Sequence, residues 1–240
     1  MFKIKIADLV VEINNKFDFV KKVCKDYIVD ENTKSDFSVC VTQEELEKDK
    51  KTANGNFSDG YVESVCAYRN ICKKIPDFDA FLLHAAVVKV DDKAYAFTAR
   101  SGTGKTTHIK LWKELLGEKA LIINGDKPII RIVDGKPLIY GTPWCGKEGY
   151  NINDCAELKS ICFIERSDIN SIEPFEMQFA VQKIVKQLII PDNPESVAKL
   201  LELLDITLKK VDVWKLKCNM DISAAKMSYK TMKDGINNEN

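Results

Sequence analysis

A glycine-rich segment with a lysine and two threonines carries the clearest chemistry in the sequence. Residues 99–107 read Ala-Arg-Ser-Gly-Thr-Gly-Lys-Thr-Thr, which follows the phosphate-loop pattern Gly-x-x-x-x-Gly-Lys-Ser/Thr except that Ala99 replaces the first glycine. Glycines let backbone N–H groups converge on phosphate oxygens at the start of a helix. Lys105 reaches the β- and γ-phosphates in this pattern, and the hydroxyl of Thr106 is a ligand for Mg²⁺. The segment therefore predicts a phosphate-binding loop for a nucleoside triphosphate.

The alternative for this segment is a glycine-rich turn between a strand and a helix with an incidental lysine. The flanking sequence favours the loop, because an apolar strand enters it and an amphipathic helix leaves it, as the pattern requires. We expect the nucleotide, ATP with Mg²⁺, to be bound by Arg100, Ser101, Gly102, Thr103, Gly104, Lys105, Thr106 and Thr107. For Arg100 a solvated side chain is the alternative to a phosphate contact.

An acidic residue and two histidines are the other candidates for chemistry. Asp126 follows the apolar run 120–123 after Asn124 and Gly125, and its carboxylate is suited to hold the metal or to accept a proton from a hydroxyl. An ordinary turn aspartate is the alternative. The chain has two histidines, His84 and His108, and both flank the loop. His84 is either a hydrogen-bonded core residue or a site residue, and His108 is either a helix-surface residue or a site residue.

The elements that must position these residues follow from the hydrophobic pattern. The run 81–88 is typical of a buried strand, and His84 falls inside it. Residues 94–98 predict the strand before the loop, and the helix after it should run from about 105 to 116 and end at Gly117. The other predicted elements of this part are a strand at 120–123, a hairpin of 129–133 with 137–140, strands at 158–164 and 211–216, helices at 175–190 and from 193, and a closing helix at 221–232 with Asp221 as N-cap.

The first third of the chain has a different pattern. Residues 2–14 alternate as one strand, 36–41 predict another, the polar stretch 42–59 predicts a solvated helix and loop, and 61–75 predicts a helix that Pro76 stops. We therefore expect an α/β protein with three parts: an N-terminal α+β appendage at 1–79, a nucleotide-binding core at 80–235 and a frayed tail at 236–240.

Composition sets limits on the class of protein. The chain has 240 residues, 36 basic against 36 acidic, so its zero net charge gives no reason to expect nucleic-acid or membrane binding. No apolar run approaches the ~18–20 residues that span a bilayer. The N-terminus lacks the apolar core of a signal peptide, and the eight cysteines contain no Cys-x-x-Cys pair. We expect reduced thiols in a cytoplasmic protein.

Several residues taken together resemble a known superfamily. His84-Ala85-Ala86-Val87-Val88, the loop Ser101–Thr107 and a strand leading to Asp126 are similar, in this order, to the HPr kinase/phosphorylase and phosphoenolpyruvate carboxykinase superfamily. Residues 140–147 and 218–221 resemble its small bacterial HPr-kinase-like branch. The resemblance implies a mixed sheet with flanking helices around a phosphate loop, and it allows a homo-oligomer.

The resemblance also implies roles for individual residues. His84 matches a histidine near the reacting phosphate, Lys105 the lysine that contacts it, and Thr106 the metal-ligand hydroxyl. Asp126 matches the second member of an acidic pair, which takes the proton from serine in HPr kinases. Gly125 stands at the first member of that pair, so one carboxylate of the family pattern is missing.

Three functions are consistent with these observations. The first is an ATP- and Mg²⁺-dependent kinase with Asp126, His84 and Lys105 as catalytic residues and a serine of a protein, peptide or metabolite as acceptor. The second, favoured by Gly125, is a nucleotide-binding regulatory protein with little catalysis. The third is a carboxykinase-like enzyme, which the short chain disfavours.

Six residues outside this set have two interpretations. The segment Trp144–Lys147 is either a structural turn or part of the substrate side, and a nucleophilic Cys145 is disfavoured because no third histidine is available to activate it. Glu63 and Arg69 can pair or reach the cleft, and we expect structural roles for both.

Overall fold

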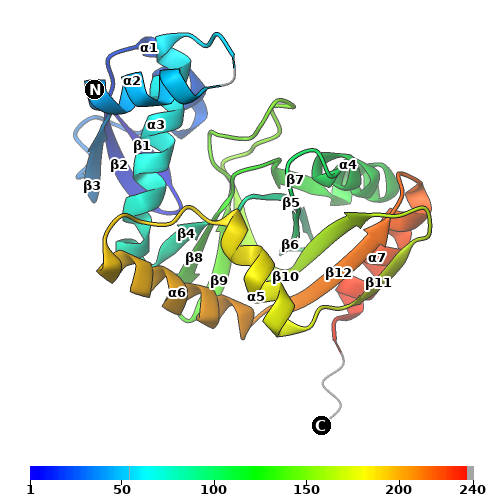
Figure 1. The fold of residues 1–240 in the computed structure, drawn as a ribbon. Coiled ribbons are helices and arrows are strands. Elements are labelled where there is room, and N and C mark those ends of the chain that lie inside the picture. The colour runs from blue at the N-terminus through cyan, green and yellow to red at the C-terminus, as the bar shows by residue number, and fades with distance from the viewer. Residues whose placement is uncertain (54, 237–240) are drawn as a thin grey trace.

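The computed structural model describes residues 1–53 and 55–236 (Figure 1). The strands are β1 (Phe2–Ile6), β2 (Leu9–Asn14), β3 (Phe37–Cys40), β4 (Ala80–Leu82), β5 (Ala85–Val90), β6 (Lys93–Thr98), β7 (Leu121–Asn124), β8 (Ile129–Val133), β9 (Lys136–Tyr140), β10 (Cys155–Arg166), β11 (Ser171–Pro174) and β12 (Asp212–Cys218). The helices are α1 (Asp18–Val23), α2 (Gln43–Thr52), α3 (Asp59–Lys74), α4 (Lys105–Leu116), α5 (Met177–Ile184), α6 (Pro194–Leu208) and α7 (Ile222–Asp234), with 3-10 turns η1 (Lys25–Tyr27), η2 (Ile75–Phe78), η3 (Gly117–Lys119) and η4 (Val185–Gln187).

A large mixed sheet forms the centre of the fold. Its strand order is β4-β8-β9-β10-β6-β5-β7, and β12 pairs with β10 and β11 with β12. β10 runs parallel to both β6 and β12, whereas β9 pairs antiparallel with its first residues. β6 and β7 also share a direction, because each is antiparallel to β5. The carboxyl ends of β6, β7, β10 and β12 therefore meet at one edge of the sheet.

Two layers of helices cover this sheet (Figure 1). Side chains alternate between its faces, so Tyr95 and Phe97 of β6 pack with α4 and α7, while Ala94 and Ala96 face α5 and α6. Each layer buries its own apolar cluster, and the fold is a mixed α/β architecture with helices on both faces, as the sequence predicts.

The N-terminal lobe has a sheet of its own. Its strand order is β1-β2-β3, and α3 packs against α1 and α2. The apolar core of this lobe extends beyond residue 79, since it contains Leu82, Ile129, Tyr140 and Trp144 from the large sheet and its loops. The lobe is therefore attached to the sheet by a continuous core.

Two strand predictions are wrong in the same way. Residues 2–14 form a hairpin and not one strand, because Ala7 and Asp8 adopt left-handed φ values of 48° and 58° and turn the chain between β1 and β2. The run 81–88 is also divided. β4 ends at Leu82 and β5 begins at Ala85, so His84 lies in the break between two strands.

The helix predictions agree more closely with the structure. α4 spans residues 105–116 as predicted, and the N-cap at Asp221 is confirmed by a hydrogen bond from the Ser223 N–H to its carboxylate, at 2.8 Å. The predicted helix at 175–190 is shorter, since α5 ends at Ile184 and η4 follows. α1 and β11 were not predicted. Residues 237–240 of the expected tail lie outside the described residues.

Candidate functional site

The loop between β6 and α4 has the backbone that its glycines permit. Gly102 and Gly104 have φ values of 77° and 121°, which residues with a Cβ rarely adopt, and α4 begins at the next residue. Ala99, at the position of the missing glycine, is not among the described residues with positive φ, so its methyl group causes no strain there. The loop thus presents a glycine-containing turn at the N-terminus of a helix, where N–H groups have no intrahelical partner.

Lys105 is the first residue of α4 and its side chain turns back toward the strand ends. Its Nζ donates to the carbonyl oxygen of Ala99 at 3.1 Å and lies 3.1 Å from Nε2 of His84. Burial lowers the pKa of Lys105, while the nearby carboxylate of Asp126 opposes this shift. A buried ammonium group with so few partners is stabilised by any anion that enters the loop.

His84 is held at the break between β4 and β5 by three neighbours. Its backbone N–H donates to the carbonyl oxygen of Gln187 at 2.9 Å, and its own carbonyl oxygen accepts from the hydroxyl of Thr98 at 2.9 Å. In the ring, Nδ1 lies 2.8 Å from Oε1 of Gln187 and Nε2 lies 2.9 Å from Oδ1 of Asp126. The imidazole is therefore fixed between η4 and the aspartate.

Asp126 follows β7, at the edge where the carboxyl ends of the strands meet. Its Oδ1 contacts His84, and its Oδ2 accepts from Nζ of Lys127 at 2.8 Å. Burial by itself would raise the pKa of Asp126, but the hydrogen bonds from His84 and Lys127 outweigh it and hold that pKa well below the usual range. The carboxylate is therefore ionised throughout the neutral and mildly acidic range.

These four side chains form one connected cluster beside the loop. Contacts run from Lys105 to His84, from His84 to Asp126 and from Asp126 to Lys127. Two ammonium groups face one carboxylate, so the cluster carries a net positive charge even with a neutral imidazole. Such a site attracts an anion, and it brings together the predicted residues Lys105, His84 and Asp126.

The donor set for a metal ion is small. In the part of the chain that the structure describes, no three His, Cys, Asp or Glu side chains gather in a way that would hold a metal ion. Mg²⁺ that accompanies a nucleotide needs only one or two protein oxygens besides water and phosphate. The hydroxyl of Thr106 and the carboxylate of Asp126 fit that requirement, whereas a metal site made of protein groups alone is not available.

The segment 141–152 covers this edge and explains Gly125. The Gly125 N–H donates to the carbonyl oxygen of Tyr150 at 2.9 Å, and a Cβ on Gly125 would lie 3.0 Å from the carbonyl oxygen of Cys145. Gly146 lies close to the next residue, because a Cβ on Gly146 would be 3.2 Å from Cβ of Asp126. Backbone thus occupies the space where the resemblance places a second carboxylate.

Asn124 fixes this segment to the sheet. Its Oδ1 accepts from the N–H groups of Asp126 and Lys127 at 2.9 and 2.7 Å. Its Nδ2 donates to the carbonyl oxygens of Thr142 and Trp144 at 3.1 and 3.3 Å. One buried amide therefore orients both the aspartate and the covering segment.

Several of the weaker candidates have structural roles. Trp144 is buried in the core of the N-terminal lobe, and its Nε1 donates to the hydroxyl of Ser64 at 3.1 Å. Burial raises the pKa of Cys145, which argues against a thiolate nucleophile. Glu63 accepts from the N–H groups of Lys16 and Phe17, at 2.6 and 3.0 Å.

Two further candidates lie apart from the cluster. Arg69 pairs with Asp49 on α2, so the expectation of a structural role is confirmed for it as for Glu63. Arg100 is exposed, and its carbonyl oxygen accepts from the N–H of Thr103 at 3.2 Å.

Three residues of the site were missed by the sequence reasoning. Lys127 is adjacent to Asp126 in sequence, and a basic residue next to a candidate carboxylate could have been recognised as its partner. Gln187 is 103 residues from its partner His84, so no local pattern marks it. Arg166, at the end of β10, donates from Nε to the carbonyl oxygen of Thr103 at 3.1 Å and from its terminal nitrogen to that of Gly102.

Comparisons with known proteins add little. No protein-family model matches the chain, and no curated protein matches it. A solved structure, the HPr(Ser) kinase/phosphatase from Coxiella burnetii, is similar over 63% of this chain and 98% of that chain, with 8% sequence identity and a TM-score of 0.33. A similarity of this size establishes neither a shared fold nor a shared activity. Membership of the superfamily therefore stays a prediction from the motifs.

Proposed function

We propose that this protein is an ATP- and Mg²⁺-dependent kinase that transfers the γ-phosphoryl group to a hydroxyl, with a serine of a protein, peptide or small molecule as acceptor. The observation that carries the proposal is the chain of contacts from Lys105 through His84 to Asp126 beside a glycine-containing loop at the start of α4. This arrangement supplies a cation, Lys105, for the transferred phosphoryl group and a carboxylate, Asp126, for the acceptor hydroxyl.

The residues divide the reaction between them. Lys105 offsets the charge on the γ-phosphoryl group. Thr106 and Asp126 would hold Mg²⁺, which would supply positive charge against the phosphate oxygens. Asp126 accepts the hydroxyl proton as the group transfers. Its low pKa is compatible with this role, because phosphoryl transfer passes through a loose transition state in which positioning and electrostatics supply most of the catalysis. His84 and Lys127 orient the carboxylate.

The first experiment tests Lys105. We expect Lys105→Ala to reduce ATP consumption by about 100-fold or more, as loss of a charge-stabilising group does in such sites. Lys113→Ala is the matched control, since Lys113 lies in the last turn of the same helix and pairs with the exposed Glu118, at 3.6 Å. Unchanged ATP binding and hydrolysis in the Lys105 variant would refute the proposal.

The second experiment identifies the acceptor. Purified protein is incubated with γ-labelled ATP and Mg²⁺ in a lysate, and the labelled species is isolated. We expect one acid-stable phosphoester, as serine gives, and no label with Lys105→Ala.

A nucleotide-binding regulatory protein is the second candidate, and Gly125 favours it. Gly125→Asp would be an ambiguous test, because its Cβ would meet the Cys145 carbonyl oxygen at 3.0 Å and displace the covering segment. Asp126→Asn is sharper. A kinase loses phosphoryl transfer in this variant and keeps nucleotide binding, whereas a regulatory protein shows no transfer even in the wild type.

A further inference from the structure

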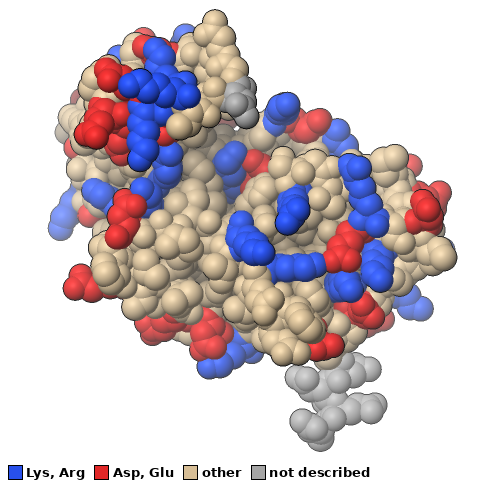
Figure 2. All heavy atoms as spheres, in the orientation of Figure 1, with Lys and Arg blue, Asp and Glu red and all other residues tan. Residues whose placement is uncertain are grey.

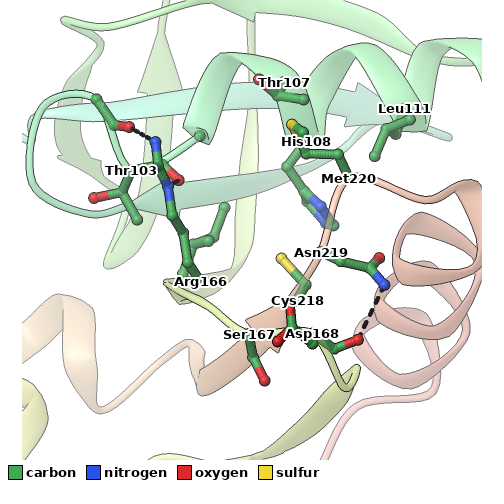
Figure 3. Close-up of a pocket in the computed structure, with 13 residues that line it drawn as sticks. Thr103, Thr107, His108, Leu111, Arg166, Ser167, Asp168, Cys218, Asn219 and Met220 are labelled. Atoms are coloured by element: carbon green, nitrogen blue, oxygen red, sulfur yellow. Dashed lines mark hydrogen bonds between the residues drawn. The ribbon is translucent and has the colours of Figure 1, made fainter.

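A cavity of about 520 Å³ lies beside the phosphate loop, and its lining includes none of Lys105, His84 and Asp126 (Figure 3). Its walls come from the loop itself, from the first two turns of α4 and from the residues that follow β10 and β12. It exists because β6, β10 and β12 are parallel, so the segments that leave their carboxyl ends meet at the same edge. Its volume is within the range of small-molecule sites.

One buried side chain on this cavity has an unused hydrogen-bonding atom. His108 is 2% exposed, and its Nδ1 has no partner among the described residues. Its Nε2 lies 2.9 Å from the hydroxyl of Ser228 on α7. Figure 3 shows the imidazole extending from α4 toward the segment of Cys218 and Asn219.

The hydrogen bonds of Ser228 bear on which nitrogen of His108 carries the proton. The Ser228 oxygen accepts from Nε1 of Trp112 at 2.9 Å and lies 3.2 Å from the carbonyl oxygen of Ala225. When the Ser228 hydroxyl donates to that carbonyl, its remaining lone pair accepts from His108, and Nε2 carries the proton. Burial lowers the pKa of His108 to about 4, which keeps the ring neutral. In this tautomer, which we adopt, Nδ1 is a buried acceptor with no donor among the described residues.

The rest of the cavity suits a flat ring. Leu111, Ile164 and Cys218 supply apolar surface, and Met220, which is 78% exposed at the mouth, is a mobile thioether that adapts to a ring. Asp168 is exposed at the same rim and offers a carboxylate to hydroxyl groups. The phosphate loop closes one end, so an occupant with phosphates would extend from the apolar walls into the loop.

We propose that this cavity binds the adenine and ribose of the nucleotide, and that His108 determines the choice of base. Nδ1 accepts a hydrogen bond from the exocyclic amino group of adenine. Guanine presents a carbonyl oxygen at the same ring position, so two acceptors would face each other. The inference rests on the proposed function in one respect, since it takes the phosphates to be bound in the loop.

The binding test compares ATP, GTP and tripolyphosphate, each with Mg²⁺, on the full chain by calorimetry. We expect ATP to bind at least ~10-fold more tightly than GTP or tripolyphosphate, the value of one good hydrogen bond. His108→Gln keeps an amide N–H near Ser228 but has no acceptor atom at the position of Nδ1. This variant should bind ATP and GTP with equal affinity, and its affinity for tripolyphosphate should be unchanged. His108→Asn, which places an amide oxygen near Nδ1, should restore part of the preference.

A second measurement needs no variant. The chain has two histidines, so ¹⁵N-histidine labelling gives signals from His84 and His108 alone. The Nδ1 signal of His108 should shift with ATP and stay in place with tripolyphosphate, whereas His84 should respond to both.

The outcomes separate the inference from the proposed function. Two results would overturn the role of His108: equal affinities for ATP, GTP and tripolyphosphate in the wild type, or an equal loss of affinity for all three in His108→Gln. The phosphate loop would still be supported in either case if the binding of tripolyphosphate depends on Lys105. If tripolyphosphate does not bind, or binds equally well to Lys105→Ala, both proposals fall.

Discussion

Asp126 has both carboxylate oxygens engaged before any ligand arrives, one by His84 and one by Lys127. A carboxylate stabilised in this way is a weak base, but it stays charged and correctly oriented. Its protonation state therefore depends on two neighbours that are themselves part of the site, and removing one neighbour should change the pH dependence of the reaction.

Lys127→Met tests this dependence. The pKa of Asp126 should rise in the variant, because a hydrogen bond and a positive charge that lower it are lost. A carboxylate whose pKa is lowered by folding contributes its full stabilisation of the folded state above its unfolded pKa of about 3.9. It loses that stabilisation as the pH falls through its pKa in the folded protein. The wild type should lose no activity through Asp126 between pH 7 and 5, whereas the acidic limb of kcat/KM in the variant should move to higher pH.

The control for this profile is Lys119→Met, since Lys119 is exposed in η3. Superimposable acidic limbs for the wild type and Lys127→Met would show that Lys127 does not act on Asp126 during turnover.

The residues of the site were predictable where the chemistry is local in sequence. Lys105 and Thr106 belong to a contiguous pattern, and Asp126 follows an apolar run that predicts a strand end. Gln187 was not predictable, because it is far from His84 in sequence and meets its side chain after the chain has folded. His84 was predicted inside a strand and lies between two strands for a similar reason. Nothing in the apolar run 81–88 shows that β4 and β5 pair with different strands.

At the scale of elements, α4 and α7 are joined by one buried hydroxyl. Ser228 accepts from Trp112 and is hydrogen-bonded to Nε2 of His108, and these two residues are one turn apart on α4. Because α4 begins at the glycine-containing loop, this contact fixes the helix whose N-terminus faces the proposed nucleotide site.

Ser228→Ala should lower the free energy of unfolding by about 3 kcal/mol, because two buried N–H donors lose their acceptor and each costs about 1–3 kcal/mol. Urea unfolding measures the change. Ser223→Ala on the exposed face of the same helix is the control, and its effect should stay within about 0.5 kcal/mol. Equal effects of the two substitutions would contradict the arrangement.

Elements with strong periodicity were predicted well and elements with few residues were not. α4 has a regular apolar face and a glycine just after its last residue, and its predicted bounds are correct. α1 has six residues, too few for a helical period to stand out. The β1–β2 turn uses Ala7 and Asp8 in place of the usual glycine, so the hairpin was read as a single strand.

At the scale of the whole molecule, the N-terminal lobe and the large sheet share a core. Trp144 reaches from the covering segment to Tyr68 of α3, with ring centroids 5.1 Å apart. Arg131 of β8 donates to the carbonyl oxygen of Ala7 at 2.9 Å. Apolar packing joins the two parts, and the ion pair of Lys73 on α3 with Asp192, at 2.7 Å, adds to it. On the face in Figure 2, acidic and basic side chains are interspersed.

Trp144→Ala should lower the free energy of unfolding by about 3–5 kcal/mol, as large-to-small changes in a core do. The wild type should unfold in a single transition, with coincident curves from circular dichroism and tryptophan fluorescence. Two separate transitions in the wild type would show that the lobe and the sheet unfold independently, as the division expected at residue 79 allows.

The way Asn124 holds the covering segment has a practical consequence for engineering. The anchors of residues 141–152 are the Asn124 amide and backbone pairs such as Gly141 with Asp154 and Ile152 with Ile123, both at 3.0 Å. The exposed side chain of Lys147 takes no part in these anchors, whereas Glu148 pairs with Lys110 of α4 at 2.8 Å. The exposed positions of the segment can therefore be exchanged as a cassette, with Asn124, Trp144 and the glycines kept, to test whether they set the acceptor preference of the proposed kinase.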